Sequence, residues 1–186
     1  MTHDTSTTPA LRVFIGLYIA PACGQWVTVT EDTDPSELHA IGKKIAAKHN
    51  AEEYAIFDTD GELGRVIGEN TPFDTVCTLA KVASELGEGS LTAFRLWLNN
   101  TYEALETPDG PDADALIDSF REEYAGAFDN LKDWAEQQIG DCYSEMLEGM
   151  GNMAQYFDYE SFAHDEECGG CIWTARADGQ LHVFTN

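Results

Sequence analysis

Positively charged residues are scarce in this sequence. Only 10 Lys and Arg stand against 34 Asp and Glu among 186 residues, which gives a formal net charge of −24. A protein this acidic repels the phosphate backbone, so we expect no nucleic acid among its partners. The imbalance predicts instead a partner whose binding surface is basic.

Long apolar runs are also missing. No stretch approaches 18 apolar residues, so we expect neither a transmembrane helix nor a membrane partner. The short apolar stretch 13–20 ahead of Cys23 is faintly similar to a lipoprotein signal, but we interpret it as a buried strand. The five cysteines (23, 77, 142, 168 and 171) form no scaffold pattern and predict reduced thiols in a cytoplasmic protein.

The common catalytic signatures are absent. The chain contains no GxGxxG, no phosphate-binding GxxxxGK[ST] loop, no GxSxG and no HExxH. Among 34 acids, no single pair stands out as general acid and base. We therefore predict a protein that is not an enzyme and has no catalytic residues and no cofactor.

Two patterns are similar to metal sites. Asp58, Asp60 and Glu62, with Glu69 at the twelfth position, imitate a calcium loop, but Leu63 stands where the sharp turn needs glycine. We interpret this segment as a solvated acidic turn.

The second pattern is the pair Cys168 and Cys171. His164 precedes it and His182 follows it, so that four possible zinc ligands can be drawn. The second CxxC of the usual zinc-binding arrangement is missing, and we interpret the pair as two thiols in a glycine-rich loop. We predict no metal.

Hydrophobic periodicity predicts an α+β chain. We expect strands at 11–20, 25–30 and 54–57, with turns at 21–24 and 58–61. Helices are predicted at 34–49, 72–86, from a Ser90 cap onward, at 113–124, at 130–139 and at 158–165. The segment 141–155 is helix-prone but broken by Gly149 and Gly151, and a hairpin is predicted from 171–175 and 181–184 around Asp178–Gly179.

These elements group into three small domains. Residues 1–10 are a polar, flexible tail, followed by an α+β domain at 11–67 and a helical middle domain at 68–110. The proline- and glycine-rich segment 107–112 marks a linker, and 111–186 form a C-terminal α+β domain.

The acidic residues are concentrated in the second half of the chain. Residues 1–95 carry a net −7, whereas residues 96–186 hold 20 acids and only three bases, a net −17. Many acids there recur at spacings of three and four, which places them on exposed helix faces without the lysines that usually alternate with them. The candidate partner-binding residues are Glu103, Asp109, Asp112, Asp114, Asp118, Glu122, Glu123, Asp129, Asp133, Glu136, Asp141, Glu145 and Glu148.

This charge is enough to imitate DNA. Duplex DNA carries about one negative charge per 1.7 Å of axis, so −24 corresponds to roughly 40 Å of duplex. The alternative is a salt-adapted, acidic, soluble binding domain without DNA mimicry, because adaptation to high salt also favours Asp and Glu over Lys. Charge alone does not separate the two.

Four stretches, in order, resemble the ArdA-type antirestriction proteins of conjugative plasmids and transposons. They are residues 12–18 with 24–27; 54–58 with Gly61 and Glu69; 120–128 with 134–136; and 156–163 with 182–184. The resemblance covers about residues 11–185. Cys168 and Cys171 are not a feature associated with that family, and the first strand connection is short.

The resemblance implies an elongated, curved chain of three small domains that forms a homodimer through its C-terminal domain. It also implies an antirestriction function: the acidic surface would mimic bent B-form DNA and occupy the DNA-binding groove of type I restriction–modification enzymes. The partner would be the methyltransferase core with its specificity subunit, and modification could be inhibited as well as restriction. The individual carboxylates of the mimic come from charge spacing and not from the family motifs.

Overall fold

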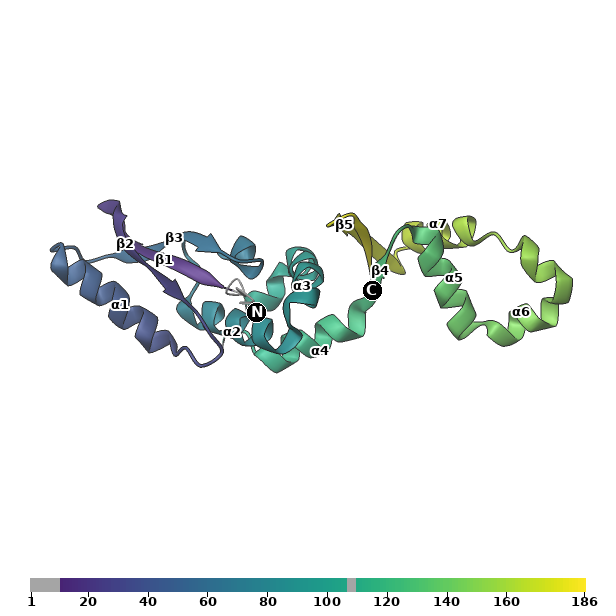
Figure 1. The fold of residues 1–186 in the computed structure, drawn as a ribbon, viewed down its shortest axis with the longest axis horizontal. Coiled ribbons are helices and arrows are strands. Elements are labelled where there is room, and N and C mark those ends of the chain that lie inside the picture. The colour runs from purple at the N-terminus through teal and green to yellow at the C-terminus, as the bar shows by residue number, and fades with distance from the viewer. Residues whose placement is uncertain (1–10, 107–109) are drawn as a thin grey trace, which may run out of the picture. The chain divides into compact units, whose positions relative to one another are not determined.

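The chain folds into two compact units. The computed structural model describes residues 11–106 and 110–186, and the units are Met1–Ser119 and Phe120–Asn186. Over the described residues the fold is α+β, as the sequence predicts, with seven α-helices and two three-stranded antiparallel sheets (Figure 1). The further division of the first unit at residue 67 stays a prediction. No helix in the described ranges is long and apolar enough to cross a membrane.

The first unit begins with a small antiparallel sheet. Its strands are β1 (Arg12–Leu17), β2 (Ala20–Thr28) and β3 (Tyr54–Asp60), in the order β2-β1-β3. Val13, Ile15 and Leu17 of β1 are buried, and helix α1 (Pro35–Lys48) packs against the sheet (Figure 1). The Asp34 carboxylate accepts a hydrogen bond from the Ser36 backbone N–H at 2.8 Å, which fixes the start of α1 as predicted.

The predicted turn at 21–24 was wrong. The strands reverse at Tyr18 and Ile19, and Leu17 pairs with Ala20, so Pro21 to Gly24 lie inside β2. Pro21 is tolerated because β2 is an edge strand, where a missing N–H costs no ladder bond. Gly24 serves packing: a Cβ there would lie 2.6 Å from the Phe14 ring.

The turn predicted at 58–61 also begins later than expected. Asp58 and Asp60 belong to β3, where they pair with Phe14 and Arg12 of β1. The Arg12 guanidinium lies 3.5 Å from the Asp60 carboxylate, so cross-strand pairing and this ion pair extend the strand through polar residues. The short 3-10 helix η1 (Leu63–Val66) follows.

Two helices complete most of the first unit. They are α2 (Phe73–Leu86) and α3 (Glu88–Asn100), and they meet at Gly87, whose φ of 70° is the left-handed conformation that glycine adopts without strain. The predicted Ser90 cap was wrong, because this glycine turn lets α3 begin at Glu88 and leaves Ser90 inside the helix.

Helix α4 leads from the first unit into the second. After the 3-10 helix η2 (Tyr102–Leu105), the predicted linker 107–112 lies partly outside the described residues. Helix α4 (Ala113–Glu123) then runs across the boundary at Ser119. The Thr78 hydroxyl donates a hydrogen bond to the Pro111 carbonyl at 3.1 Å, which ties the start of this segment to α2.

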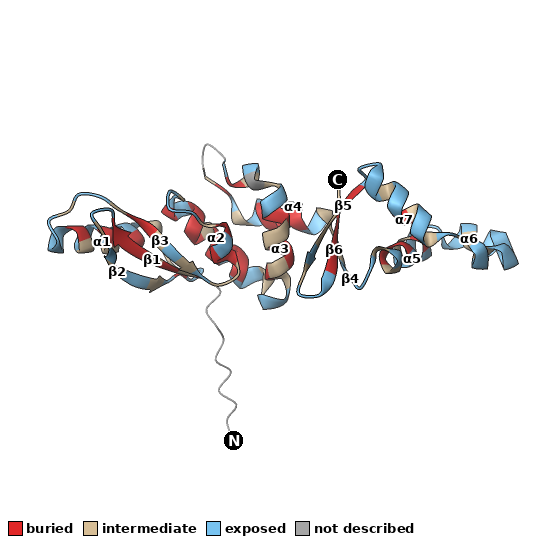
Figure 2. Ribbon diagram, turned by 90° about the horizontal axis from the view of Figure 1, so that it is seen from above, coloured by how far each residue is buried: buried red, intermediate tan, exposed pale blue. Residues whose placement is uncertain are grey.

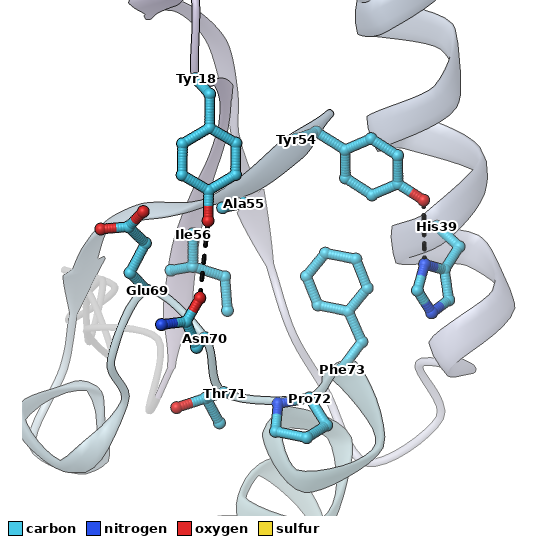
Figure 3. A pocket seen from close by; sticks show the side chains of 10 residues that line it. All are labelled: Tyr18, His39, Tyr54, Ala55, Ile56, Glu69, Asn70, Thr71, Pro72 and Phe73. Atoms are coloured by element: carbon cyan, nitrogen blue, oxygen red, sulfur yellow. Dashed lines mark hydrogen bonds between the residues drawn. The ribbon is translucent and has the colours of Figure 1, made fainter. Parts of the chain in front are cut away.

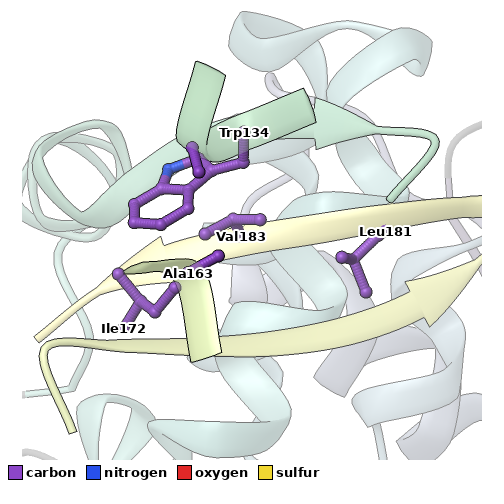
Figure 4. Close-up of a cluster of buried hydrophobic side chains, with 6 residues drawn as sticks. Trp134, Ala163, Ile172, Leu181 and Val183 are labelled. Atoms are coloured by element: carbon purple, nitrogen blue, oxygen red, sulfur yellow. The ribbon is translucent and has the colours of Figure 1, made fainter. Parts of the chain in front are cut away.

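The second unit is built on a sheet of β4 (Tyr124–Phe128), β6 (Gln180–Thr185) and β5 (Ile172–Ala177), in that order. Helices α5 (Leu131–Cys142) and α7 (Tyr159–Cys168) contact each other and this sheet. Their shared core consists of Trp134, Ala135, Ala163, Ile172, Leu181 and Val183 (Figure 4).

The closing hairpin is confirmed. Asp178 and Gly179 connect β5 to β6 with φ values of 51° and 82°, the positive pair that a two-residue hairpin turn requires. The sequence expectation lacked β4, because this five-residue strand shows no alternation and forms by pairing with the distant β6.

The segment between α5 and α7 contributes no buried side chain. It consists of α6 (Ser144–Met150) and the 3-10 helix η3 (Gly151–Tyr156), and neither has a buried residue. Figure 2 shows α6 as mostly exposed, and Leu147 is its one residue of intermediate burial. The expected break is present at Gly151, where φ is 56° and α6 ends, whereas Gly149 lies within α6.

Candidate functional site

The candidate carboxylates occupy both units. Of the thirteen, Asp109 lies outside the described residues. The first unit holds Glu103, Asp112, Asp114 and Asp118, and the second holds the other eight. Ten of the twelve described residues are exposed; Glu123 and Asp133 are half-buried. The structure therefore gives nearly every described candidate access to a partner.

Helix α4 presents three of its four acids on one side. Asp114, Asp118 and Glu122 follow each other at intervals of four residues, so they lie on one face of the helix, and all three are exposed. Leu116, Ile117 and Phe120 are buried on the opposite side, which fixes the orientation of the helix. This row of like charges is mildly unfavourable for the helix itself, by about 0.2–0.5 kcal/mol per neighbouring pair.

Three candidate carboxylates have local structural partners. Asp112 accepts a hydrogen bond from the backbone N–H of Ala115 at 2.9 Å, near the start of α4. Asp133 accepts one from the Asn130 side chain at 2.8 Å, at the start of α5. Glu136 lies 3.6 Å from the Lys132 ammonium group. These three stabilise helices and are less available to a partner than the others.

A further group of acids lies around α5 and α6. Asp129, Asp141, Glu145 and Glu148 are all exposed. Within the described ranges, no ion pair involves any of the four, and Lys132 is the only base on α5 or α6. Solvent therefore meets their carboxylates without a neutralising cation from the protein beside them.

The same segment exposes large apolar side chains, which the sequence prediction missed. Tyr143, Met146 and Met150 recur at intervals of three and four and are 49%, 46% and 37% exposed. Met153 and Tyr156 of η3 are 60% and 73% exposed. Contiguous apolar exposure of this kind is typical of a protein interaction surface. The helical spacing of residues 143, 146 and 150 is visible in the sequence. Such spacing is equally typical of a helix face buried in the core and of one that binds a partner, so it did not reveal the exposure.

The residues of the calcium-like pattern have other contacts. Asp60 pairs with Arg12. The Glu62 carboxylate forms one ion pair with the Nε of Arg95 and a second with Arg65, at 3.7 Å. Two of the four carboxylates that would have to converge on a calcium ion are thus engaged separately with arginines.

The zinc-like pattern is likewise dispersed. His182 is buried, and its Nδ1 lies 3.0 Å from the Tyr124 hydroxyl, in a pair whose burial raises the pKa of Tyr124. Cys168 lies 3.5 Å from His164, and both are exposed residues of α7. Throughout 11–106 and 110–186, no group of three or more His, Cys, Asp or Glu side chains is arranged to hold a metal ion.

Two of the thiols are poorly suited to nucleophilic chemistry. Burial in α2, and secondarily the Asp74 charge, raises the pKa of Cys77 to about 11. The Glu166 charge raises the pKa of Cys171. Since the thiolate is the reactive form, both groups remain thiols at neutral pH.

The sequence matches the model of one protein family. The model of a family described as antirestriction protein (ArdA) matches residues 21–177. The chain therefore belongs to the ArdA family of antirestriction proteins, inhibitors that act on restriction enzymes. No curated protein matches the sequence.

Proposed function

We propose that this protein inhibits type I restriction–modification enzymes by mimicking bent B-form DNA. In this proposal its carboxylates occupy the DNA-binding groove of the methyltransferase core with its specificity subunit. The observation that carries the proposal is the set of exposed carboxylates on α4, α5 and α6, which have few bases near them.

The amount of charge supports this proposal. Residues 120–186 hold 14 acids and three bases, a net −11. At one charge per 1.7 Å of duplex axis, −11 corresponds to about 19 Å of DNA. The first unit holds the remaining −13. Each unit thus has enough charge to replace more than half of a helical turn of about 34 Å.

Carboxylates can take the place of phosphates in such a groove. Lys and Arg side chains that line a DNA-binding channel contact phosphates without reading sequence. An acidic protein that offers carboxylates to the same side chains needs no base edges, so one inhibitor can act on enzymes with different target sequences. A mimic that is already bent also avoids the few kcal/mol that bending a DNA site costs. The same contacts block restriction and, where the groove is shared, modification.

The proposal includes a homodimer formed through the C-terminal part of the chain. The apolar side chains of α6 and η3 support it, because Met and Tyr side chains are enriched where protein interfaces exclude water. A dimer would carry twice the charge of one chain and would imitate a correspondingly longer DNA segment. As an inhibitor of this kind, the protein needs no cofactor and acts in the cytoplasm of a cell that has received a conjugative element.

Competition with DNA tests the proposal. Labelled duplex containing the target site is bound to a purified type I methyltransferase, and the protein is titrated into the complex. We expect displacement of the duplex, with no retardation of DNA by the protein alone, because −24 repels phosphates. The control is a variant with Asp129, Asp141, Glu145 and Glu148 changed to their amides, which should compete more weakly. DNA that stays bound at saturating inhibitor contradicts the proposal.

A further inference from the structure

The first unit contains a small aromatic pocket that is separate from the candidate carboxylates. It has a volume of about 200 Å³, and its walls come from the turn after β1, from α1, from β3 and from the loop ahead of α2 (Figure 3). Roughly six or seven water molecules occupy this volume in liquid water. The pocket is therefore large enough for one side chain from another molecule.

The aromatic walls are held in place. The Tyr54 hydroxyl lies 3.0 Å from His39 Nδ1, and Figure 3 shows the two side chains meeting beside Phe73. The rings of Tyr54 and Phe73 are nearly parallel, at 12°. Gly42 of α1 leaves room for Tyr54, since a Cβ there would come within 2.2 Å of its ring. These contacts pre-organise the pocket, so a ligand need not order it.

The pocket lining includes one carboxylate, that of Glu69. Tyr18 donates a hydrogen bond to the Asn70 side-chain oxygen at 3.5 Å. The Glu69 carboxylate near the Tyr18 hydroxyl raises the pKa of Tyr18. The lining residues include neither Lys nor Arg. Phe73 begins α2, whose N-terminal end would favour an anion, but Asp74 in its first turn offsets this.

We propose that this pocket receives an arginine side chain of the restriction enzyme. Aromatic faces attract a cation, and the Glu69 carboxylate can bind the guanidinium at the rim. The guanidinium is planar and weakly hydrated, so it stacks on rings better than the ammonium of lysine. The inference rests on the proposed function, because the occupant is a side chain of the enzyme that the acidic surface engages.

Direct binding is tested with N-acetyl-arginine amide. The neutral control is N-acetyl-citrulline amide, which has the same shape without the charge. Aromatic NMR signals of Tyr18, Tyr54 and Phe73 should shift with the arginine compound at millimolar concentration and stay unchanged with citrulline. Equal shifts with both compounds, or none with either, would overturn the assignment of a cation pocket.

The link to the enzyme is tested in the DNA-competition assay. Glu69→Gln should weaken inhibition about tenfold, whereas Glu52→Gln, an equal change at another exposed acid, should change it less than twofold. Tyr18→Ala removes a half-exposed aromatic ring that lines the pocket, so it should weaken inhibition about as much as Glu69→Gln. Thermal melts establish that the variants remain folded.

The outcomes separate the two proposals. If wild type displaces DNA but Glu69→Gln matches Glu52→Gln, the pocket inference is wrong and the mimic stands. If wild type displaces no DNA, the proposed function itself fails. Arginine-compound binding would then still report on the pocket alone.

Discussion

Neutralising two carboxylates on α4 should stabilise the protein and weaken its inhibition at the same time. The variant is Asp118→Asn with Glu122→Gln. Both residues are exposed and follow Asp114 on one face of the helix, opposite the buried Leu116 and Phe120. The substitutions leave side-chain size nearly unchanged, so the core beneath α4 is untouched.

The gain in stability comes from two sources. The variant removes two like-charge neighbours, Asp114–Asp118 and Asp118–Glu122, each worth about 0.2–0.5 kcal/mol. It also removes an acid from the last turn of α4, where the helix dipole disfavours negative charge by about 0.3–1 kcal/mol. The free energy of unfolding should therefore rise by about 1 kcal/mol. For a chain of this size, that raises Tm by about 2–4 °C.

The loss of affinity follows from the same two charges. An exposed ion pair contributes about 0.2–1 kcal/mol, so two lost pairs with the enzyme cost about 0.4–2 kcal/mol. This corresponds to a roughly two- to thirtyfold weaker complex. The expected result is thus opposite in sign for folding and for binding.

Thermal melts and DNA competition on the same preparations measure both effects. The matched control is Glu31→Gln with Glu52→Gln, which removes two exposed acids of the first unit outside the candidate set. A variant that is more stable but inhibits as well as wild type would refute a role for the α4 face. A variant that inhibits less only because it unfolds would refute the stability reasoning.

Three further predictions concern salt, assembly and pH. Raising monovalent salt from about 50 to 500 mM should weaken the enzyme complex by screening while raising Tm; affinity that is flat or rises with salt would favour the salt-adapted alternative. Met146→Asp with Met153→Asp should shift the proposed dimer toward monomer in light scattering, whereas Gln137→Asp on α5 should not. A dimer that forms equally well in the double variant would exclude α6 and η3 from its interface. Hydrogen bonds from the Ser36 side chain and backbone lower the pKa of Asp34 below its ordinary 3.8, so the stability it contributes is present above that pH and lost as pH falls. Asp34→Ala should therefore lower Tm at pH 7, and in melts across pH its Tm should approach that of wild type as the pH falls well below 3.8.

Features with a local physical cause could be predicted from the sequence. The start of α1 follows from the Asp34 cap and Pro35, and the hairpin turn follows from Asp178 and Gly179, since neighbouring residues decide both conformations. The apolar spacing that buries Leu116 and Phe120 also leaves the α4 acids exposed. The excess of carboxylates over bases is a property of composition and needs no structure.

Features that depend on distant pairing were decided by the tertiary structure. Strand β4 exists because β6 pairs with it, and β2 begins before Pro21 because an edge strand tolerates proline. The pocket brings together Tyr18, Tyr54 and Glu69 from three segments, which no local pattern connects. The sequence by itself therefore determined how much negative charge the protein carries and on which helix faces much of it lies. The helix caps of Asp112 and Asp133 and the ion pair of Glu136 likewise join residues three or four apart. Where the aromatic pocket forms, by contrast, depended on contacts between residues far apart in the chain.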